Sequence, residues 1–197
     1  MSSPESRLGR GRLFVISGPS GAGKGSVVTE LVRRRPELVV SVSVTTRPAR
    51  QGERNGVHYN FISEQEFKAM RDRGDLLEWA EVYRHYYGTR RSPVEAALAS
   101  GSDVICELDI QGAESVKRAR PDARLIFIEP PSMDDLRARL RGRGTEDPRD
   151  MTTRINAAYE EMKRKELYDH IVINDRLEDA VADVLRILDG TNEREQS

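Results

Sequence analysis

The feature that most constrains the fold is a glycine-rich loop between an apolar run and an amphipathic segment. Residues 13–16 are all apolar, and residues 27–32 have the apolar spacing of a helix. The loop residues are Gly18, Pro19, Ser20, Gly21, Ala22, Gly23, Lys24, Gly25 and Ser26. Glycines let successive backbone N–H groups converge on one anion, and a helix N-terminus adds positive potential. The sequence therefore predicts a phosphate loop, with Lys24 on the β- and γ-phosphates of a nucleotide.

Three more apolar runs follow, at residues 104–106, 125–128 and 171–173, and longer amphipathic stretches separate them. Uniformly apolar strands spaced by helices are typical of a parallel sheet that is covered on both faces. We therefore expect an α/β fold with a parallel sheet and helices on both sides.

Two segments break this alternation. Residues 43–92 hold several turn signals, an alternating stretch at 57–61 and the capping-box spacing of Ser63 and Glu66. A small antiparallel insert is the simplest account of this segment. Residues 141–148 contain two glycines between helical segments, which is typical of a mobile flap.

The composition limits the partners and the location. The 32 Lys and Arg residues nearly balance the 33 Asp and Glu residues, so the charge favours neither a nucleic acid nor a membrane as a partner. The single cysteine, Cys106, lies in an apolar run, so no disulfide framework is possible. No segment approaches the ~20 apolar residues of a membrane span, and the first twelve residues lack an apolar signal region. We expect a cytoplasmic protein.

Basic and hydroxyl side chains gather near the start of the 43–92 segment. Arg47 and Arg50 stand three residues apart beside threonines, and Tyr59 follows. Two guanidinium forks and a tyrosine hydroxyl can surround a dianionic phosphate. Solvated surface charge is the alternative for the two arginines.

One carboxylate interrupts an otherwise apolar strand at Glu78. Guanine presents N1–H and N2–H₂ as adjacent donors, so an inward carboxylate can accept from both, whereas adenine lacks this pair. Glu78 is therefore our candidate for guanine recognition, and the nearby hydroxyls of Tyr87 and Thr89 support it. A solvent-facing place on an amphipathic strand is the alternative.

The apolar run at 104–106 ends in acid, with Glu107 and then Asp109. This Walker-B pattern brings a carboxylate to the C-terminal edge of the sheet, near Mg²⁺ or its waters. The residues from Asp109 to Gly112 also fit the D-x-x-G of a GTPase, but the chain has no N-K-x-D segment for guanine. A GTPase switch is therefore disfavoured.

Together these segments resemble the guanylate kinase family over residues 12–188. The most specific matches are Thr45, Thr46, Arg47, Pro48, Arg50, Gly52, Glu53, Gly56, Tyr59 and Phe61. The resemblance implies ATP-dependent phosphorylation of GMP, and also of dGMP, with Mg²⁺. It implies one domain over residues 12–190, built from a core, an insert and a lid, with flexible tails at 1–11 and 191–197. The core takes 12–42, 93–140 and 157–190, the GMP-binding insert takes 43–92, and the lid takes 141–156.

The resemblance also assigns roles to residues. The GMP phosphate is assigned to Arg47, Arg50, Tyr59 and Tyr87, and the guanine to Ser43, Glu78 and Thr89. Asp109 is assigned to the guanine side and the metal's water shell, and Arg143 and Arg154 are the lid arginines that close on ATP. Direct in-line transfer needs no nucleophilic residue, so the catalytic set is the counter-charges Lys24, Arg47, Arg143 and Arg154.

The sequence leaves open the contacts to Mg²⁺ and to adenine, two alternative functions and the oligomeric state. Gly25 stands where a hydroxyl usually follows the loop lysine, so Ser26 and Asp109 are expected to reach Mg²⁺ only through water. Asn174, near a strand end, is a candidate for contacting adenine. There are two alternative functions: a catalytically silent interaction module, and a kinase for another nucleoside monophosphate. The sequence does not decide between a monomer and a homo-oligomer.

Overall fold

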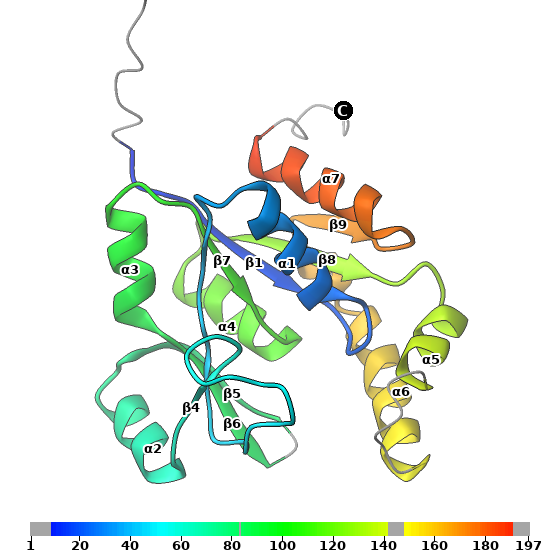
Figure 1. The fold of residues 1–197 in the computed structure, drawn as a ribbon, viewed down its shortest axis with the longest axis horizontal. Helices are drawn as coiled ribbons and strands as arrows, with labels where there is room; N and C mark the ends of the chain where they lie inside the picture. Colours follow the sequence, from blue (N-terminus) through cyan, green and yellow to red (C-terminus); the bar gives the residue numbers. More distant parts are fainter. Residues whose placement is uncertain (1–8, 83, 142–147, 191–197) are drawn as a thin grey trace, which may run out of the picture. The chain divides into compact units, whose positions relative to one another are not determined.

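The computed structural model describes residues 9–82, 84–141 and 148–190 (Figure 1). Its larger sheet has five strands in the order β2-β7-β1-β8-β9, and the β2/β7 and β8/β9 pairs are parallel. The strands are β1 (Leu13–Ser17), β2 (Val39–Val40), β7 (Val104–Glu107), β8 (Arg124–Glu129) and β9 (His170–Ile173). The predicted α/β fold with a parallel sheet is confirmed.

The central strands are buried as their composition requires. All five residues of β1 are buried, and so are the four residues from Leu125 to Ile128 in β8. A strand without polar alternation is stable only when both of its faces are covered. The edge strand β2 has only two residues, one of them exposed, and the sequence analysis did not predict it.

The chain divides into two compact units. The first lies within Met1–Phe14, Glu37–Cys106 and Glu114–Ala123, and the second within Val15–Pro36, Glu107–Ala113 and Arg124–Ser197. Strand β1 and helix α4 (Ile110–Ala119) contribute residues to both units.

The first unit contains a second sheet of four strands in the order β4-β3-β6-β5. These are β3 (Val44–Thr45), β4 (Asn60–Phe61), β5 (Leu76–Val82) and β6 (His85–Arg90). The antiparallel prediction is right for β3/β6 and β5/β6 and wrong for β4, which runs parallel to β3. The sheet is therefore mixed. The alternation at 57–61 predicted a longer strand than β4, because Val57 and His58 are exposed and lie outside the strand.

Helices α2 (Glu64–Asp72) and α3 (Arg91–Ala99) also belong to this unit. The predicted start of α2 is confirmed, since the Ser63 hydroxyl accepts a hydrogen bond from the Glu66 backbone N–H at 3.1 Å. Helix α2 packs on the small sheet through a core of Val44, Phe67, Met70 and Leu76. This core holds the strands that carry the candidate GMP-binding residues.

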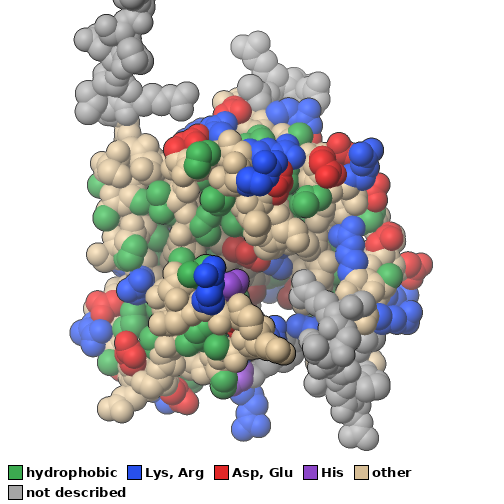
Figure 2. Space-filling model, in the orientation of Figure 1, with side chains coloured by type: hydrophobic (Ala, Val, Ile, Leu, Met, Phe, Trp, Pro, Cys, Tyr) green, Lys and Arg blue, Asp and Glu red, His purple; other side chains and the backbone are tan. Residues whose placement is uncertain are grey.

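The second unit combines β8 and β9 with several helices. These are α1 (Lys24–Arg34), α5 (Met133–Arg141), α6 (Pro148–Met162), the 3₁₀ turn η1 (Lys165–Leu167) and α7 (Leu177–Leu188). Helix α1 packs against α7, and α5 against α6 through Leu136, Leu140 and Ala158 (Figure 1). Over α1 and α7, basic and acidic side chains lie interspersed (Figure 2). Arg35 and Asp189, which directly follow these two helices, form an ion pair. None of the helices in the described ranges combines the length and the apolar character that a membrane span requires.

Candidate active site

The phosphate loop follows β1 in the second unit and leads directly into α1. Gly18 and Gly23 have φ angles of 140° and 93°, which side-chain-bearing residues rarely adopt. A Cβ at Gly18 would lie 2.2 Å from the Ile128 carbonyl oxygen, and one at Gly23 would lie 2.3 Å from the Asn174 amide nitrogen. Both positions therefore require glycine, for conformation and for space.

Lys24 lies at the start of α1, and its side chain folds back over the loop. Its Nζ donates to the carbonyl oxygens of Gly18 at 2.6 Å and Pro19 at 3.1 Å. The loop closes on itself through a hydrogen bond from the Ala22 N–H to the Pro19 carbonyl at 3.1 Å. The ammonium is thus positioned over the loop, while Gly25 and Ser26 on the first turn of α1 are exposed.

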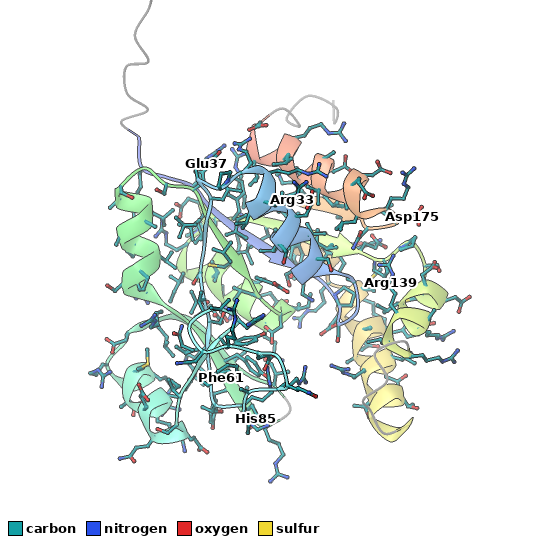
Figure 3. All side chains as sticks on the ribbon, viewed as in Figure 1. Arg33, Glu37, Phe61, His85, Arg139 and Asp175 are labelled. Atoms are coloured by element: carbon teal, nitrogen blue, oxygen red, sulfur yellow. The ribbon has the colours of Figure 1, made fainter. Side chains whose placement is uncertain are left out.

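Two residues far along the chain support the loop, one directly after β9 and one on α5. The Asn174 side-chain amide donates to the Ala22 carbonyl oxygen at 2.7 Å and is nearly fully buried. Arg139, labelled in Figure 3, donates to the Asn174 carbonyl oxygen at 2.8 Å. Asn174 was a candidate for contacting adenine, whereas in the structure its side-chain amide holds the backbone of the phosphate loop.

A carboxyl group on α6 also lies beside the loop, and the sequence analysis missed it. Burial raises the pKa of Glu161, whereas the Lys24 ammonium and a hydrogen bond from the Ser20 backbone act in the opposite direction. The nearby Asp109 carboxylate raises this pKa further. No local pattern distinguishes Glu161 from other acidic residues of α6, so only the folded structure identifies it.

Two acidic residues of the second unit lie at the end of β7: Glu107 is its last residue, and Asp109 follows it. Asp109 accepts a hydrogen bond from the Gly112 N–H at 2.7 Å, so its carboxylate stabilises the start of α4. The Glu107 carboxylate oxygens lie 3.7 Å from where a Cβ of Gly25 would stand, which places Glu107 beside the phosphate loop. Within the described ranges, no group of three or more His, Cys, Asp or Glu side chains could hold a metal ion.

One of the two predicted lid arginines lies within the described residues. Arg143 lies outside the described residues. Arg154 lies on α6 with a half-buried side chain. Helices α5 and α6 end and begin at Arg141 and Pro148, so the two helical segments predicted beside the flap are confirmed.

The candidate phosphate-binding residues of the first unit form a cluster around Arg47. Its guanidinium donates to the two oxygens of Glu53 at 2.8 and 3.0 Å, and its carbon lies 5.5 Å from the centre of the Tyr59 ring. The Tyr59 and Tyr87 rings meet edge to face at 6.0 Å. The hydrogen bonds to Glu53 raise the pKa of Arg47, and a hydrogen bond with Tyr87 adds to this. The Arg50 side chain is exposed next to this cluster.

The candidate guanine-binding residues lie on paired strands. Glu78 on β5 stands opposite Thr89 on β6, and the Thr89 hydroxyl donates to the Glu78 carboxylate at 2.7 Å. Glu78 is only 6% exposed, so the alternative of a solvent-facing carboxylate is wrong. Ser43, just before β3, is half-buried, and its carbonyl accepts from the Asn60 N–H.

Cys106 lies at the end of β7 and is buried, as predicted. Burial raises the pKa of its thiol to about 12, and the negative charge of Glu78 contributes to this rise. The thiol is therefore neutral and unreactive at physiological pH. The buried Glu78 carboxylate is thus close enough to Cys106 for its charge to shift the pKa of the thiol.

The fold and the glycine-rich loop define the class of protein: it is a P-loop protein, with a parallel sheet and a phosphate-binding strand–loop–helix unit. The sequence profile described as guanylate kinase matches residues 10–191. The chain therefore belongs to the guanylate kinase family.

Curated relatives and a solved structure agree with this assignment. A guanylate kinase of Carboxydothermus hydrogenoformans is 48% identical over 179 residues, which cover 91% of this chain and 88% of the relative. One from Thermus thermophilus is 48% identical over 188 residues, which cover 95% and 84%. The crystal structure of guanylate kinase from Anaplasma phagocytophilum matches with a TM-score of 0.79 and 30% identity, covering 95% of this chain and 89% of that one.

Proposed function

We propose that this protein transfers the γ-phosphoryl group of ATP to GMP, giving ADP and GDP, and that it also accepts dGMP. The observation that carries the acceptor assignment is the buried Glu78 carboxylate with its bond from Thr89. A carboxylate offers about four acceptor positions, and the Thr89 hydroxyl takes one of them. A buried acceptor-only group favours a base with two adjacent donors, which guanine has and adenine lacks.

The Arg47 cluster supports a phosphate as the other end of this substrate. It belongs to the same unit as Glu78, and it combines a sheltered guanidinium with tyrosine hydroxyls. We assign the GMP phosphate to Arg47, Arg50, Tyr59 and Tyr87, and the guanine to Ser43, Glu78 and Thr89, with Asp109 on the guanine side.

The phosphate loop supports ATP as the donor. The loop from Gly18 to Ser26 binds its phosphates through backbone N–H groups, which Pro19 alone lacks, and Lys24 neutralises charge on the transferred group. The acceptor oxygen of GMP is already anionic, so the reaction needs alignment and counter-charge rather than a nucleophilic residue. We place Arg154, and Arg143 outside the described residues, among these counter-charges.

Mg²⁺ fits this donor set as an ion that arrives with ATP. Because Asp109 already binds the start of α4 and the described carboxylates form no three-residue site, the protein suits an ion that keeps several waters. Ser26 and Asp109 would contact it through water, and the bound ion would neutralise charge on the ATP phosphates. The domain boundaries, a place in purine nucleotide metabolism and a cytoplasmic location stay predictions from the sequence.

A coupled assay of ADP release tests the function. The purified protein is supplied with ATP, Mg²⁺ and one acceptor at a time from GMP, dGMP, AMP, UMP and dTMP. We expect turnover with GMP and dGMP and none above background with the other three. Turnover with another acceptor would indicate a different monophosphate kinase, and no turnover with any acceptor would indicate a catalytically silent module.

A further inference from the structure

We propose that Glu53 is a positioning residue for the GMP phosphate: it fixes the Arg47 side chain and the turn that carries Arg50 before the substrate binds. This proposal rests on the proposed function, because it takes the Arg47 cluster as the phosphate site. Glu53 itself is assigned no contact with GMP.

The first observation is how Glu53 uses the donors of Arg47. Its Oε1 accepts from Nη2 at 2.8 Å and its Oε2 accepts from Nη1 at 3.0 Å, while the Pro48 carbonyl oxygen accepts from Nη1 at 2.7 Å. A guanidinium has five N–H donors in a fixed plane. These three bonds and the hydrogen bond between Arg47 and Tyr87 orient the plane of the guanidinium. A guanidinium that is already oriented can meet the oxygens of a phosphate without first losing side-chain freedom.

The surroundings make this orientation rigid. The Arg47 guanidinium carbon lies 5.5 Å from the Tyr59 ring centre and 5.8 Å from that of Phe61, which Figure 3 labels. The side chains of Arg47 and Glu53 are only 11% and 18% exposed. In such shelter a two-bond ion pair is held more firmly than one on an open surface.

The second observation is that Glu53 also fixes the backbone at Arg50. Its Oε2 accepts from the Arg50 N–H at 2.7 Å, and its own N–H donates to the Arg50 carbonyl at 3.0 Å. The turn between them contains Gly52 at φ 85°, the left-handed position that a type II turn requires. One carboxylate therefore connects both arginines that we assign to the phosphate.

Two opposite effects on GMP binding follow from a carboxylate at this place. Its negative charge repels a phosphate, so its removal would strengthen binding if repulsion were the larger effect. Its hydrogen bonds order two side chains in advance, so its removal would weaken binding if preorganisation were the larger effect. We infer that preorganisation is the larger effect, because Glu53 makes three hydrogen bonds within the cluster and is already neutralised by Arg47.

The test compares Glu53→Gln and Glu53→Asp with a matched control, Glu64→Gln. Glu64 forms an ion pair with Lys68 on α2 of the same unit, and the side chains of both residues are exposed. The control therefore removes an ion pair without touching the cluster. We expect Glu53→Gln to raise KM for GMP about tenfold while KM for ATP changes less than about twofold. Glu53→Asp keeps the charge with a shorter reach and should fall between Glu53→Gln and the wild type.

A binding measurement separates positioning from a general loss of structure. Calorimetric titration with GMP and with guanosine should show that Glu53→Gln weakens GMP binding and leaves guanosine binding unchanged, because Glu53 acts only through the phosphate. The control variant should bind both as the wild type does. Circular dichroism and Tm should confirm that Glu53→Gln folds, and Glu53→Asp supplies the same comparison if it does not.

Three results would overturn the proposal. These are an unchanged KM for GMP in Glu53→Gln, a lower KM for GMP, or equal losses of GMP and guanosine affinity. Failure of the proposed function would look different, because the wild-type protein itself would then show no turnover with GMP.

Discussion

The phosphate loop and the Arg47 cluster both bind phosphate in our account, but they are built from different parts of the chain. The loop uses backbone N–H groups in one continuous segment, with glycines at φ angles that only they adopt freely and one lysine folded over it. The Arg47 cluster uses side chains from β4, β6 and the turn at Arg50, held by aromatic rings and Glu53. A backbone cradle depends on local conformation, whereas a side-chain cluster depends on packing between strands.

This difference separates what each region can recognise. Backbone N–H groups bind phosphate oxygens without regard to the base, so the loop suits the tail of a triphosphate. The first unit adds the buried Glu78 and Thr89 pair to its arginines, so it can select a base as well as a phosphate. Substitutions should therefore affect the two nucleotides separately.

Lys24→Met should produce the largest effect. It removes the ammonium group that lies over the carbonyl oxygens of the loop. Loss of a single preorganised donor typically slows a reaction by about 10²–10³-fold. We expect kcat to fall by at least this factor while GMP still binds in a calorimetric titration. Lys68→Met, at an exposed position of α2, is the matched control. A kcat of the Lys24 variant within tenfold of wild type would contradict the assignment.

Glu78→Gln should act on the other nucleotide. The amide places an N–H₂ group where guanine donors require an acceptor, so KM for GMP should rise by about 10- to 100-fold with KM for ATP unchanged. Glu81→Gln on the same strand is the control, because Glu81 is exposed. Equal changes in both Michaelis constants would mean that Glu78 supports the fold rather than the base.

Asn174→Ala should have a smaller effect, directed to ATP. The variant loses the buried hydrogen bond to the Ala22 carbonyl and loosens the loop without removing a phosphate donor. We expect KM for ATP to rise about three- to tenfold, with KM for GMP unchanged, in steady-state kinetics. A rise in KM for GMP of the same size would remove the distinction between the two regions.

Acid stability gives the smallest expected effect. The hydrogen bonds from Arg47 lower the pKa of Glu53 below its ordinary value of 4.5. A lowered carboxyl pKa contributes stability that is fully present above the ordinary value and is lost as the pH falls through the lowered one. The difference in free energy of unfolding between wild type and Glu53→Gln should therefore be constant above pH 4.5 and shrink below it. Urea unfolding at several pH values measures this difference, and a difference that grows with acid would contradict the pairing.

The sequence predicted the local features of both regions. The apolar runs became β1, β7, β8 and β9, and the loop led into α1, because burial and glycine conformation act over neighbouring residues. The inward carboxylate of Glu78 was also predictable, since it interrupts an apolar strand. These features need no knowledge of which distant segments meet.

The features that the sequence could not predict depend on distant contacts. The direction of β4 follows from its pairing with β3, and two residues carry no signal of parallel pairing. Asn174 meets Ala22 across 152 positions of the chain, and Glu161 meets the loop from α6. Glu53 stands within the family motif, but its hydrogen bonds to Arg47 and Arg50 became visible only once the turn had formed.

The separation of the two regions can be measured most directly by titrating the protein with GMP and then with AMP in the absence of ATP. Our account predicts that the wild-type protein binds GMP but not AMP at the same concentrations. It also predicts that Glu78→Gln weakens GMP binding and brings it close to that of AMP. Equal affinity of the wild-type protein for GMP and AMP, or GMP affinity unchanged in Glu78→Gln, would contradict it.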